Sequence, residues 1–287
     1  MQIYDVTEYA KLTDSAYQQE VERLQVELLK LQSWAIANQK RLAIVFEGRD
    51  ASGKTGIINV MKRHLIPKHI NYVNIGIPDQ IKSKYWLDTF RKEMPKKGQI
   101  TFFDRSWYTR AVVEITMGYC KKKQYTSFMR RVNSWEEELS NEGVELKKIY
   151  LSITKNEQES RFHKRQKDPL RYWKLTKHDL SMAKKWDIYS FFKEQMFNRT
   201  STQLHPWVVI NANNKMIARL SSLRFVLNEF NYPDKNLEIA NDWTSKITNY
   251  SIEFEGISFE NLSHQQYEVL KKKSSISLID TFGQYVE

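Results

Sequence analysis

The sequence predicts an α/β fold with a mostly parallel central sheet flanked by helices. Short apolar runs alternate with segments in which apolar residues recur every three or four positions, which is typical of β–α–β units. The first apolar run leads directly into a glycine-rich loop that opens a helix. The 287 residues are enough to bury one large core, so one main domain is expected.

The expected strands are short apolar runs bounded by charged or turn residues. They cover residues 42–46, 72–77, 100–103, 146–153 and 207–210. The expected helices show the spacing of an amphipathic face. They cover residues 55–65, 84–94, 108–119, 126–141, 155–166, 180–197 and 216–230.

Two extensions flank the expected core, which spans residues 41–232 and includes a lid at 160–182. The N-terminal extension, residues 1–40, contains a helical stripe formed by Val21, Leu24, Leu28, Leu31 and Ala35. This stripe predicts either a docking or oligomer surface or an ordinary core helix. The C-terminal extension, residues 233–287, has weak periodicity, and its role is not predicted.

Composition limits the class of protein. The chain is 41% hydrophobic and 28% charged, as in soluble globular proteins, and charged residues interrupt every apolar run before it could span a membrane. Cys120 is the only cysteine and no leader pattern opens the chain, so a cytoplasmic location is expected. The net charge of +11 favours anionic partners without saying which anion.

The glycine-rich loop has the sequence Gly48-Arg-Asp-Ala-Ser-Gly-Lys-Thr55, which fits the phosphate-loop pattern. Its glycines let successive N–H groups face one point, and the following helix N-terminus adds positive potential there. Lys54 supplies an ammonium for bridging phosphates, and Thr55 offers a hydroxyl to Mg²⁺. The flanking strand disfavours the alternative of a chance glycine turn. The predicted phosphate-binding residues here are Gly48, Arg49, Ala51, Ser52, Gly53, Thr55 and Gly56, with Lys68 as a further cation.

Asp50 lies inside this loop, where a carboxylate would repel phosphate unless a cation or a transferable proton lies between them. We therefore expect Asp50 to hold a metal ion or to act in catalysis. The alternative is an Asx-type hydrogen bond to the loop backbone.

A second acid, Asp104, follows the expected strand 100–103 and should lie at the carboxyl edge of the sheet beside the loop. We expect it to hold Mg²⁺, directly or through water. Arg105 and Arg110 follow, and their planar guanidinium groups suit phosphate oxygens, the alternative being solvated arginines near a turn. Glu114, one helical turn beyond Arg110, is expected to pair with it rather than join the metal ligands.

A basic segment follows the fourth expected strand. Arg161 and Arg165 share a helix face, where their like charges repel unless an anion lies between them. Pro169 breaks the helix, and Arg171 and Lys174 then continue the basic line. Beside a phosphate loop this segment predicts a lid over bound phosphate. The alternative is a solvated basic helix.

Other kinds of catalysis lack support in the sequence. The six histidines are scattered, with neither a metal-ligand spacing nor a neighbouring nucleophile pattern. Phosphoryl transfer needs alignment and neutralisation of phosphate oxygens more than covalent help, and the cations named above supply both.

Four motifs occur together and in order within about residues 41–232. They are Gly48-Arg-Asp-Ala-Ser-Gly-Lys-Thr-Gly56, Phe103-Asp-Arg-Ser-Trp-Tyr-Thr-Arg110, Met117-Gly-Tyr-Cys120, and Asp168-Pro-Leu-Arg-Tyr-Trp-Lys-Leu175 followed by Asp179. This set resembles the second family of polyphosphate kinases. The resemblance implies a fold similar to that of thymidylate kinases, with a phosphate loop and a helical lid. It also implies Mg²⁺-dependent phosphoryl transfer, with Mn²⁺ as a substitute, between inorganic polyphosphate and a nucleotide.

The resemblance also implies residue roles. Asp50 would assist metal binding or activate the acceptor phosphate, Lys54 would be the loop lysine, and Asp104 would be the second metal carboxylate. The implied phosphate-binding cations are Arg105, Arg110, Arg161, Arg165, Arg171 and Lys174. ADP or GDP is the favoured acceptor and AMP or GMP the alternative, with ATP or GTP on the other side of the reaction. A homo-oligomer is implied, with the N-terminal helix as a candidate interface.

Two other functions compete with this one. An ATP-dependent nucleoside monophosphate kinase would share the phosphate loop but would need fewer cations, because it handles a shorter phosphate chain. A basic nucleic-acid-binding module with a vestigial loop would share the charge, but the sequence lacks the stacking and groove motifs of such modules.

Overall fold

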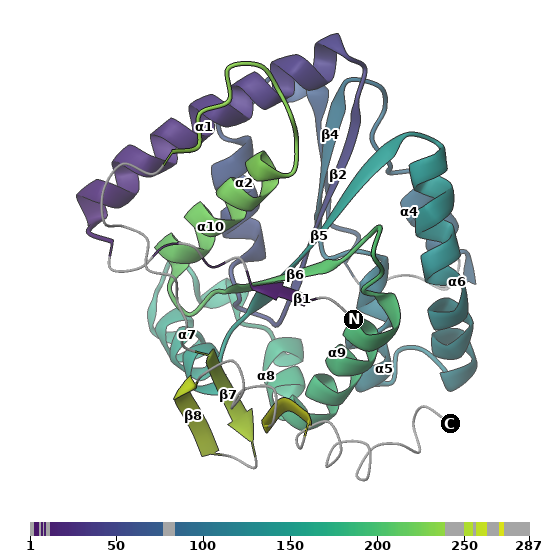
Figure 1. Ribbon diagram of the computed structural model, residues 1–287. Helices are drawn as coiled ribbons and strands as arrows, with labels where there is room; N and C mark the ends of the chain where they lie inside the picture. Colours follow the sequence, from purple (N-terminus) through teal and green to yellow (C-terminus); the bar gives the residue numbers. More distant parts are fainter. Residues whose placement is uncertain are drawn as a thin grey trace.

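A parallel sheet forms the centre of the molecule (Figure 1). The computed structural model describes residues 3–5, 7, 9, 12–76, 84–238, 250–254, 257–262 and 270–272. Among these residues, six strands pair side by side, every pair parallel. In spatial order they are β1 (Ile3–Asp5), β6 (Trp207–Asn211), β5 (Val144–Ser152), β2 (Arg41–Gly48), β4 (Gln99–Asp104) and β3 (Ile70–Val73). The predicted α/β fold with a mostly parallel sheet is confirmed.

Strand β2 shows why the sheet needs helices on both faces. Leu42, Ile44 and Phe46 belong to one buried apolar cluster, whereas Ala43 and Val45 belong to another. Successive side chains of a strand point to opposite faces, so a strand buried on both faces is apolar throughout. The apolar run at residues 42–46 therefore reflects burial of β2 on both faces.

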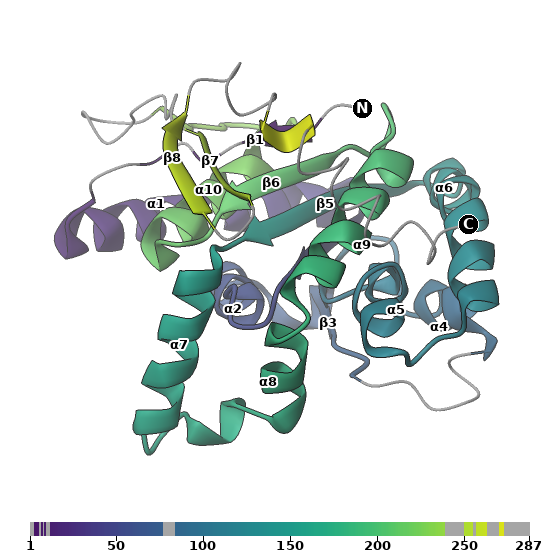
Figure 2. The same cartoon turned by 90° about the horizontal axis from the view of Figure 1, so that it is seen from below.

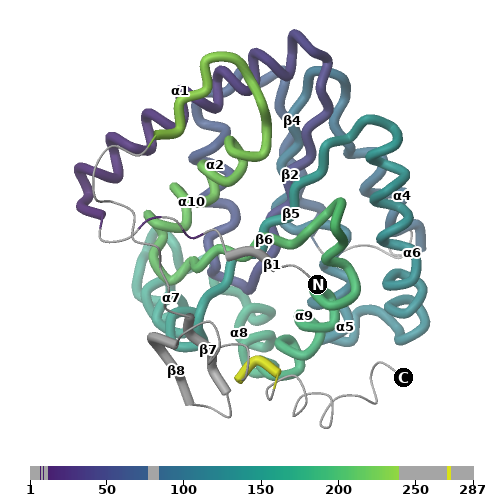
Figure 3. Tube along the Cα trace, in the orientation of Figure 1, coloured from purple at the N-terminus to yellow at the C-terminus, as the bar shows by residue number. Residues whose placement is uncertain are grey.

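Helices cover the two faces of the sheet (Figures 1 and 3). On one face lie α1 (Asp14–Ala37), α2 (Lys54–Lys62) and α10 (Lys215–Asn228). On the other lie α4 (Trp86–Arg91), α5 (Val113–Met117), α6 (Lys122–Asn141) and α9 (Trp186–Thr200). Each group contributes its apolar residues to one of the two clusters, so the core consists of two layers separated by the sheet.

The N-terminal stripe is part of the core. Thr13 caps α1 by accepting a hydrogen bond from the N–H of Ala16, and the helix then packs against α10. Leu24, Leu31 and Ala35 are fully buried within the single chain. The core-helix interpretation of the stripe is therefore confirmed, and its use as an exposed docking face is wrong. The homo-oligomer itself stays a prediction.

Two predicted helices are each divided in two. The segment 180–197 forms α8 (Lys177–Ala183) and α9, because a capping box between Thr176 and Asp179 starts α8 earlier and the chain turns before Trp186. The segment 108–119 forms a 3₁₀ turn, η2 (Trp107–Arg110), and then α5, which ends at Gly118 with φ of 76°.

Smaller differences lie at the edges of the sheet. Strand β1 was not predicted, because three residues are too few to show a period. Strand β3 begins two residues earlier than expected, and the expected strand end at Ile77 lies outside the described residues. A 3₁₀ turn, η1 (Pro67–His69), precedes β3.

The predicted lid stands out from the body of the molecule as a helical arm. Helix α7 (Lys155–Lys167), the 3₁₀ turn η3 (Tyr172–Lys174) and α8 project together from the sheet edge (Figure 2). Thr154 caps α7, and Asp168 ends it before Pro169. The arm therefore begins at Lys155, five residues before the expected start of the lid, and ends at Ala183, one residue after its expected end.

Most of the C-terminal extension lies outside the described residues. Within it, β7 (Tyr250–Phe254) and β8 (Ile257–Leu262) form a separate antiparallel pair. No helix in the described ranges combines the length and apolar character required to cross a membrane.

Candidate active site

The glycine-rich loop joins β2 to α2 at the carboxyl edge of the sheet. Gly48, Ala51 and Gly53 have φ values of 141°, 66° and 107°. A Cβ on Gly48 would lie 2.5 Å from the carbonyl oxygen of Leu151 on strand β5, so only glycine fits there. The backbone therefore curls between strand and helix, as a phosphate loop requires.

The Lys54 side chain lies against this loop. Its Nζ donates to the carbonyl oxygens of Gly48 at 2.7 Å and Arg49 at 3.1 Å. Burial lowers the pKa of Lys54 and the charge of Arg105 lowers it further, against the opposing effect of Asp50 and other nearby carboxylates. A bound phosphate would favour the charged ammonium, so phosphate binding and protonation of Lys54 are linked.

Helix α7 holds the loop through its carbonyl groups. Gln158 Nε2 donates to the carbonyl oxygen of Asp50 at 2.8 Å. Arg161 Nη1 donates to the carbonyl oxygens of Ala51 and Ser52 at 2.7 and 3.2 Å. A trans peptide directs its C=O and N–H to opposite sides, so the N–H groups that follow these carbonyls point away from α7.

Arg161 makes further contacts of the same kind. Its Nη2 donates to the carbonyl oxygens of Ala212 and Asn213, and its Nε donates to Glu157 at 2.6 Å. These bonds occupy the guanidinium, which is 3% exposed. The sequence assigned Arg161 to direct phosphate binding, but the structure places it behind the loop, where it holds the backbone.

The Arg49 side chain also turns away from the loop opening. It donates to the carbonyl oxygen of Trp186 and to Ser190 Oγ, at 3.0 and 2.7 Å. Its guanidinium carbon lies 3.4 Å from the ring centre of Trp186 and 4.0 Å from that of Tyr189. Burial lowers the pKa of Arg49. This side chain therefore joins the loop to the start of α9.

Asp104 lies beside the loop at the end of β4. Its Oδ2 accepts hydrogen bonds from Thr55 Oγ1 at 2.5 Å and from the Tyr72 hydroxyl at 3.0 Å. Mg²⁺ is held in proteins by one or two carboxylates together with water and phosphate oxygens. In the described part of the chain, no group of three or more His, Cys, Asp or Glu side chains could hold a metal. Asp104 and Thr55 therefore fit a divalent metal whose remaining ligands are phosphate oxygens and water.

Asp50 forms an ion pair with Arg105 across the site. Burial alone would raise the pKa of Asp50, but the charges of Arg105 and Lys54 outweigh it and hold the pKa below its ordinary value. Burial lowers the pKa of Arg105, but the negative charge of Asp50 outweighs this effect, so the pKa of the arginine is raised. Both groups are thus charged at neutral pH. The role of Asp50 as a metal ligand stays a prediction.

The backbone of Arg105 is held in a rare conformation, with φ of 68°. Its N–H donates to the carbonyl oxygen of Phe46 at 3.0 Å. Glu47 Oε1 accepts hydrogen bonds from the N–H and Oγ of Ser106 at 2.7 and 2.8 Å, and burial raises the pKa of this glutamate. Strained backbone persists where its surroundings hold it, typically at functional sites. This role of Glu47 was not predicted, because in the sequence Glu47 is only a polar residue at the end of an apolar strand.

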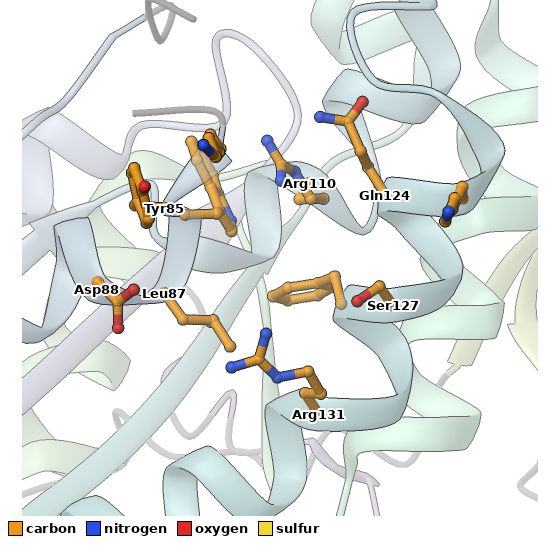
Figure 4. Close-up of a pocket in the computed structure, with 11 residues that line it drawn as sticks. Tyr85, Leu87, Asp88, Arg110, Gln124, Ser127 and Arg131 are labelled. Carbon is orange, nitrogen blue, oxygen red and sulfur yellow. The ribbon is translucent and has the colours of Figure 1, made fainter. Parts of the chain in front are cut away.

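Arg110 pairs with Glu114, as predicted, with Nε donating to Oε2 at 2.7 Å. Both residues are buried, and the guanidinium carbon lies 4.5 Å from the Trp86 ring centre. Arg110 also lines a pocket of about 380 Å³ between α4 and α6 (Figure 4). The charged residues of this pocket are Lys84, Asp88, Arg110, Lys123 and Arg131.

Further cations lie on the lid arm and at the start of α10. Arg165 Nη1 lies 3.4 Å from the carbonyl oxygen of Lys174, and Arg171 pairs with Asp168 at 3.2 Å. At the start of α10, burial lowers the pKa of Lys215, and four arginines lower it further. They are Arg161, Arg171, Arg219 and Arg165. The sequence pattern missed Lys215 and Arg219, which join the cluster only through the fold.

Lys68 lies at the opposite edge of the sheet. It belongs to η1, before β3 begins, and Ile70 is in register with Ile100, which pairs with Leu42. Gly48 is six residues farther along β2, a distance of about 20 Å at the usual rise of a strand. The prediction that Lys68 binds phosphate at the loop is therefore wrong.

A phosphate loop, an acid at the end of the neighbouring strand and a helical lid on a parallel sheet define a P-loop kinase fold. The family model described as "Polyphosphate kinase 2 (PPK2)" matches residues 11–238. The chain therefore belongs to the polyphosphate kinase 2 family.

Relatives and a solved structure agree with this assignment. The chain is 42% identical to the "GDP-polyphosphate phosphotransferase" of Mycolicibacterium smegmatis, over 78% of this chain and 80% of that protein. It is 39% identical to "Polyphosphate kinase PPK2B" of Corynebacterium glutamicum, over 83% and 78% of the two chains. The crystal structure of polyphosphate kinase 2 from Arthrobacter aurescens TC1 matches with a TM-score of 0.72 and 25% identity, over 80% and 85% of the two chains.

Proposed function

We propose that this chain transfers a phosphoryl group, reversibly, between inorganic polyphosphate and a nucleoside diphosphate, with Mg²⁺ as the metal. Membership of the polyphosphate kinase 2 family and the names of the relatives support both substrates. The observation that carries the proposal is the glycine-rich loop, with Lys54 bonded against it and Arg105 paired with its Asp50, and with the basic residues Arg165, Arg171, Lys215 and Arg219 nearby. Like charges gathered in one place favour a ligand with many negative charges.

The residues divide the work of the transfer. Lys54 and the loop N–H groups bind the phosphates at the loop, and Arg105 and Arg110 neutralise charge on the phosphoryl group in transfer. Asp104 and Thr55 would hold the metal, which when bound neutralises phosphate oxygens. Asp50 orients Arg105 through their ion pair. Arg165 and Lys215 bind the part of the polyphosphate chain beyond the loop.

The acceptor nucleotide fits the pocket beside Arg110. Its volume of about 380 Å³ lies within the range of small-ligand sites. Its lining combines three basic side chains besides Arg110 with the rings of Tyr85, Trp86 and Phe128. Cations suit the acceptor phosphates and aromatic rings suit a base. ADP and GDP are the proposed acceptors, ahead of AMP and GMP.

An activity assay with the purified chain tests this function. With Mg²⁺, long-chain polyphosphate and ADP or GDP, we expect the corresponding triphosphate to form, and its yield to fall when EDTA is added. The control replaces polyphosphate with ATP and offers dTMP or AMP as the acceptor. Rapid transfer from ATP to a monophosphate, with none from polyphosphate, would instead identify a nucleoside monophosphate kinase. High-affinity RNA binding without either transfer would identify a nucleic-acid-binding module.

Replacing Arg165 with alanine should raise the half-saturating concentration of polyphosphate about tenfold, because one charged hydrogen-bonding group is lost from the chain's path. The melting temperature should change little, since Arg165 is partly exposed and its hydrogen bond to a carbonyl group is long, at 3.4 Å. Arg130→Ala, on the exposed surface of α6, is the matched control. An unchanged polyphosphate dependence in Arg165→Ala would show that the lid helix is merely solvated.

A further inference from the structure

A fully buried ion pair contacts the segment that carries the site's two arginines. Lys148 Nζ on β5 lies 2.8 Å from Glu136 Oε2 on α6, and neither side chain is exposed. Glu136 Oε1 accepts a hydrogen bond from Trp107 Nε1 at 2.9 Å. Lys148 Nζ donates to the Tyr108 hydroxyl at 3.0 Å. The pair therefore contacts Trp107 and Tyr108, two of the four residues between Arg105 and Arg110.

A buried ion pair is weak evidence for a stabilising role. The cost of removing two charges from water roughly cancels their attraction, and apolar residues of similar size are often as stable or more so. Burial lowers the pKa of Lys148 and raises that of Tyr108, as the surrounding low dielectric requires. A costly buried pair needs another reason, and fixing the geometry of its partners supplies one.

Packing alone leaves the orientation of this segment less defined. The Trp107 ring meets those of Phe90, Phe103 and Trp135 edge to face, with ring centres 4.9 to 5.8 Å apart. Edge-to-face packing restricts the position of the ring but allows more than one orientation, whereas a hydrogen bond from the indole N–H to a fixed carboxylate specifies one. The Glu136 carboxylate therefore sets the rotation of the indole, and with it the start of η2.

The same lysine also ties down α9. Lys148 Nζ donates to the carbonyl oxygen of Thr200 at the end of that helix, at 2.8 Å. The other end of α9 begins with Trp186, whose ring lies against Arg49 of the phosphate loop. One buried ammonium thus contacts both the arginine-bearing segment and the helix that supports the loop.

We propose that Glu136 and Lys148 are positioning residues for phosphoryl transfer, which hold Arg105 and Arg110 in their working geometry through Trp107 and Tyr108. The inference rests on the proposed function for the roles of the two arginines. Displacing a group that orients substrate by about 1 Å can lower the rate about a hundredfold without unfolding the protein. The pair should therefore affect turnover more than stability.

The double variant Glu136→Gln/Lys148→Met separates these two effects. It removes both charges together, keeps an acceptor for the Trp107 indole and leaves no unpaired buried charge. We expect a melting temperature within a few degrees of wild type and a kcat reduced about 10- to 100-fold. Lys147→Met is the matched control, because Lys147 neighbours Lys148 on β5 but pairs with the partly exposed Glu229. Its kcat should stay within about twofold of wild type.

A double-mutant cycle with Arg110→Lys shows whether the pair acts through that arginine. If it does, adding Glu136→Gln/Lys148→Met to Arg110→Lys lowers kcat little further, because the geometry that the pair maintains is already lost. If the losses in kcat multiply both with Arg110→Lys and, in a parallel cycle, with Arg105→Lys, or if the double variant has wild-type kcat, the proposal is overturned. A double variant that does not fold is replaced in the cycle by Tyr108→Phe, which removes one hydrogen bond between the pair and the segment but leaves the two charges paired.

A second readout does not depend on turnover. The same cycle, measured on the dissociation constant of tripolyphosphate by calorimetry, should show the same coupling with Arg110→Lys. Wild-type protein that forms no triphosphate but shows this coupling contradicts the proposed function and supports the positioning role. Wild-type protein that forms triphosphate while neither kcat nor binding is coupled contradicts the positioning role alone.

Discussion

Asp104→Asn should lower kcat by about a thousandfold or more. The asparagine keeps an oxygen that can accept the hydrogen bonds from Thr55 and Tyr72, so the fold beside the loop should persist. It loses the charge that a divalent metal requires of its carboxylate ligand. Steady-state kinetics with saturating polyphosphate and nucleotide would give the loss in kcat, and calorimetry should show that polyphosphate still binds.

Tyr72→Phe is the control for this variant. It removes one hydrogen bond to the same Asp104 oxygen but leaves the charge, so kcat should fall only a few-fold. Equal losses in the two variants would show that the hydrogen bonds of Asp104 matter rather than its charge. Normal turnover in Asp104→Asn would remove Asp104 from the metal site.

Arg105→Lys should lower kcat about a hundredfold or more. Lysine keeps the positive charge beside Asp50 and faces the same backbone strain, but an ammonium cannot bind two phosphate oxygens at once as a planar guanidinium does. The melting temperature should therefore change little while kcat falls. Thermal denaturation and initial rates, measured on the same preparation, check both expectations.

Arg41→Lys is a matched control for Arg105→Lys. Arg41 lies at the amino end of β2 and donates to the carbonyl oxygens of Pro95 and Glu142, far from the loop. Its replacement should affect stability at most and leave kcat unchanged. A kcat for Arg105→Lys close to that of wild type would show that only the charge at this position is needed.

The parts of the fold that could be predicted are those with a local signal. The buried strand before Gly48, the loop and the helix after Lys54 follow one another in the chain, so their pattern is complete in the sequence. Asp104 was predictable because parallel strands end at one edge. The division of α8 from α9 was not, because both halves keep a helical pattern and only their different packing separates them.

The role of a charged residue proved harder to predict than its presence. Arg161 and Lys68 both suggested phosphate binding, but Arg161 donates to loop carbonyls and Lys68 lies at the far edge of the sheet. Gln158, Glu47 and Lys148 form hydrogen bonds with partners that are distant in the sequence, which no spacing rule connects. Such roles depend on tertiary neighbours, so the sequence pattern carries no signal for them.

The hydrogen bonds from α7 to the phosphate loop connect the helical arm mechanically to the loop. Gln158 and Arg161 bond the first half of α7 to three carbonyl groups of the phosphate loop. Arg165 lies one turn farther along the same helix, in the projecting part of the arm. A rigid rod cannot swing at one end without turning at the other. A movement of α7 relative to the sheet would therefore displace the loop carbonyls, so we predict that polyphosphate binding at the arm changes the conformation of the phosphate loop.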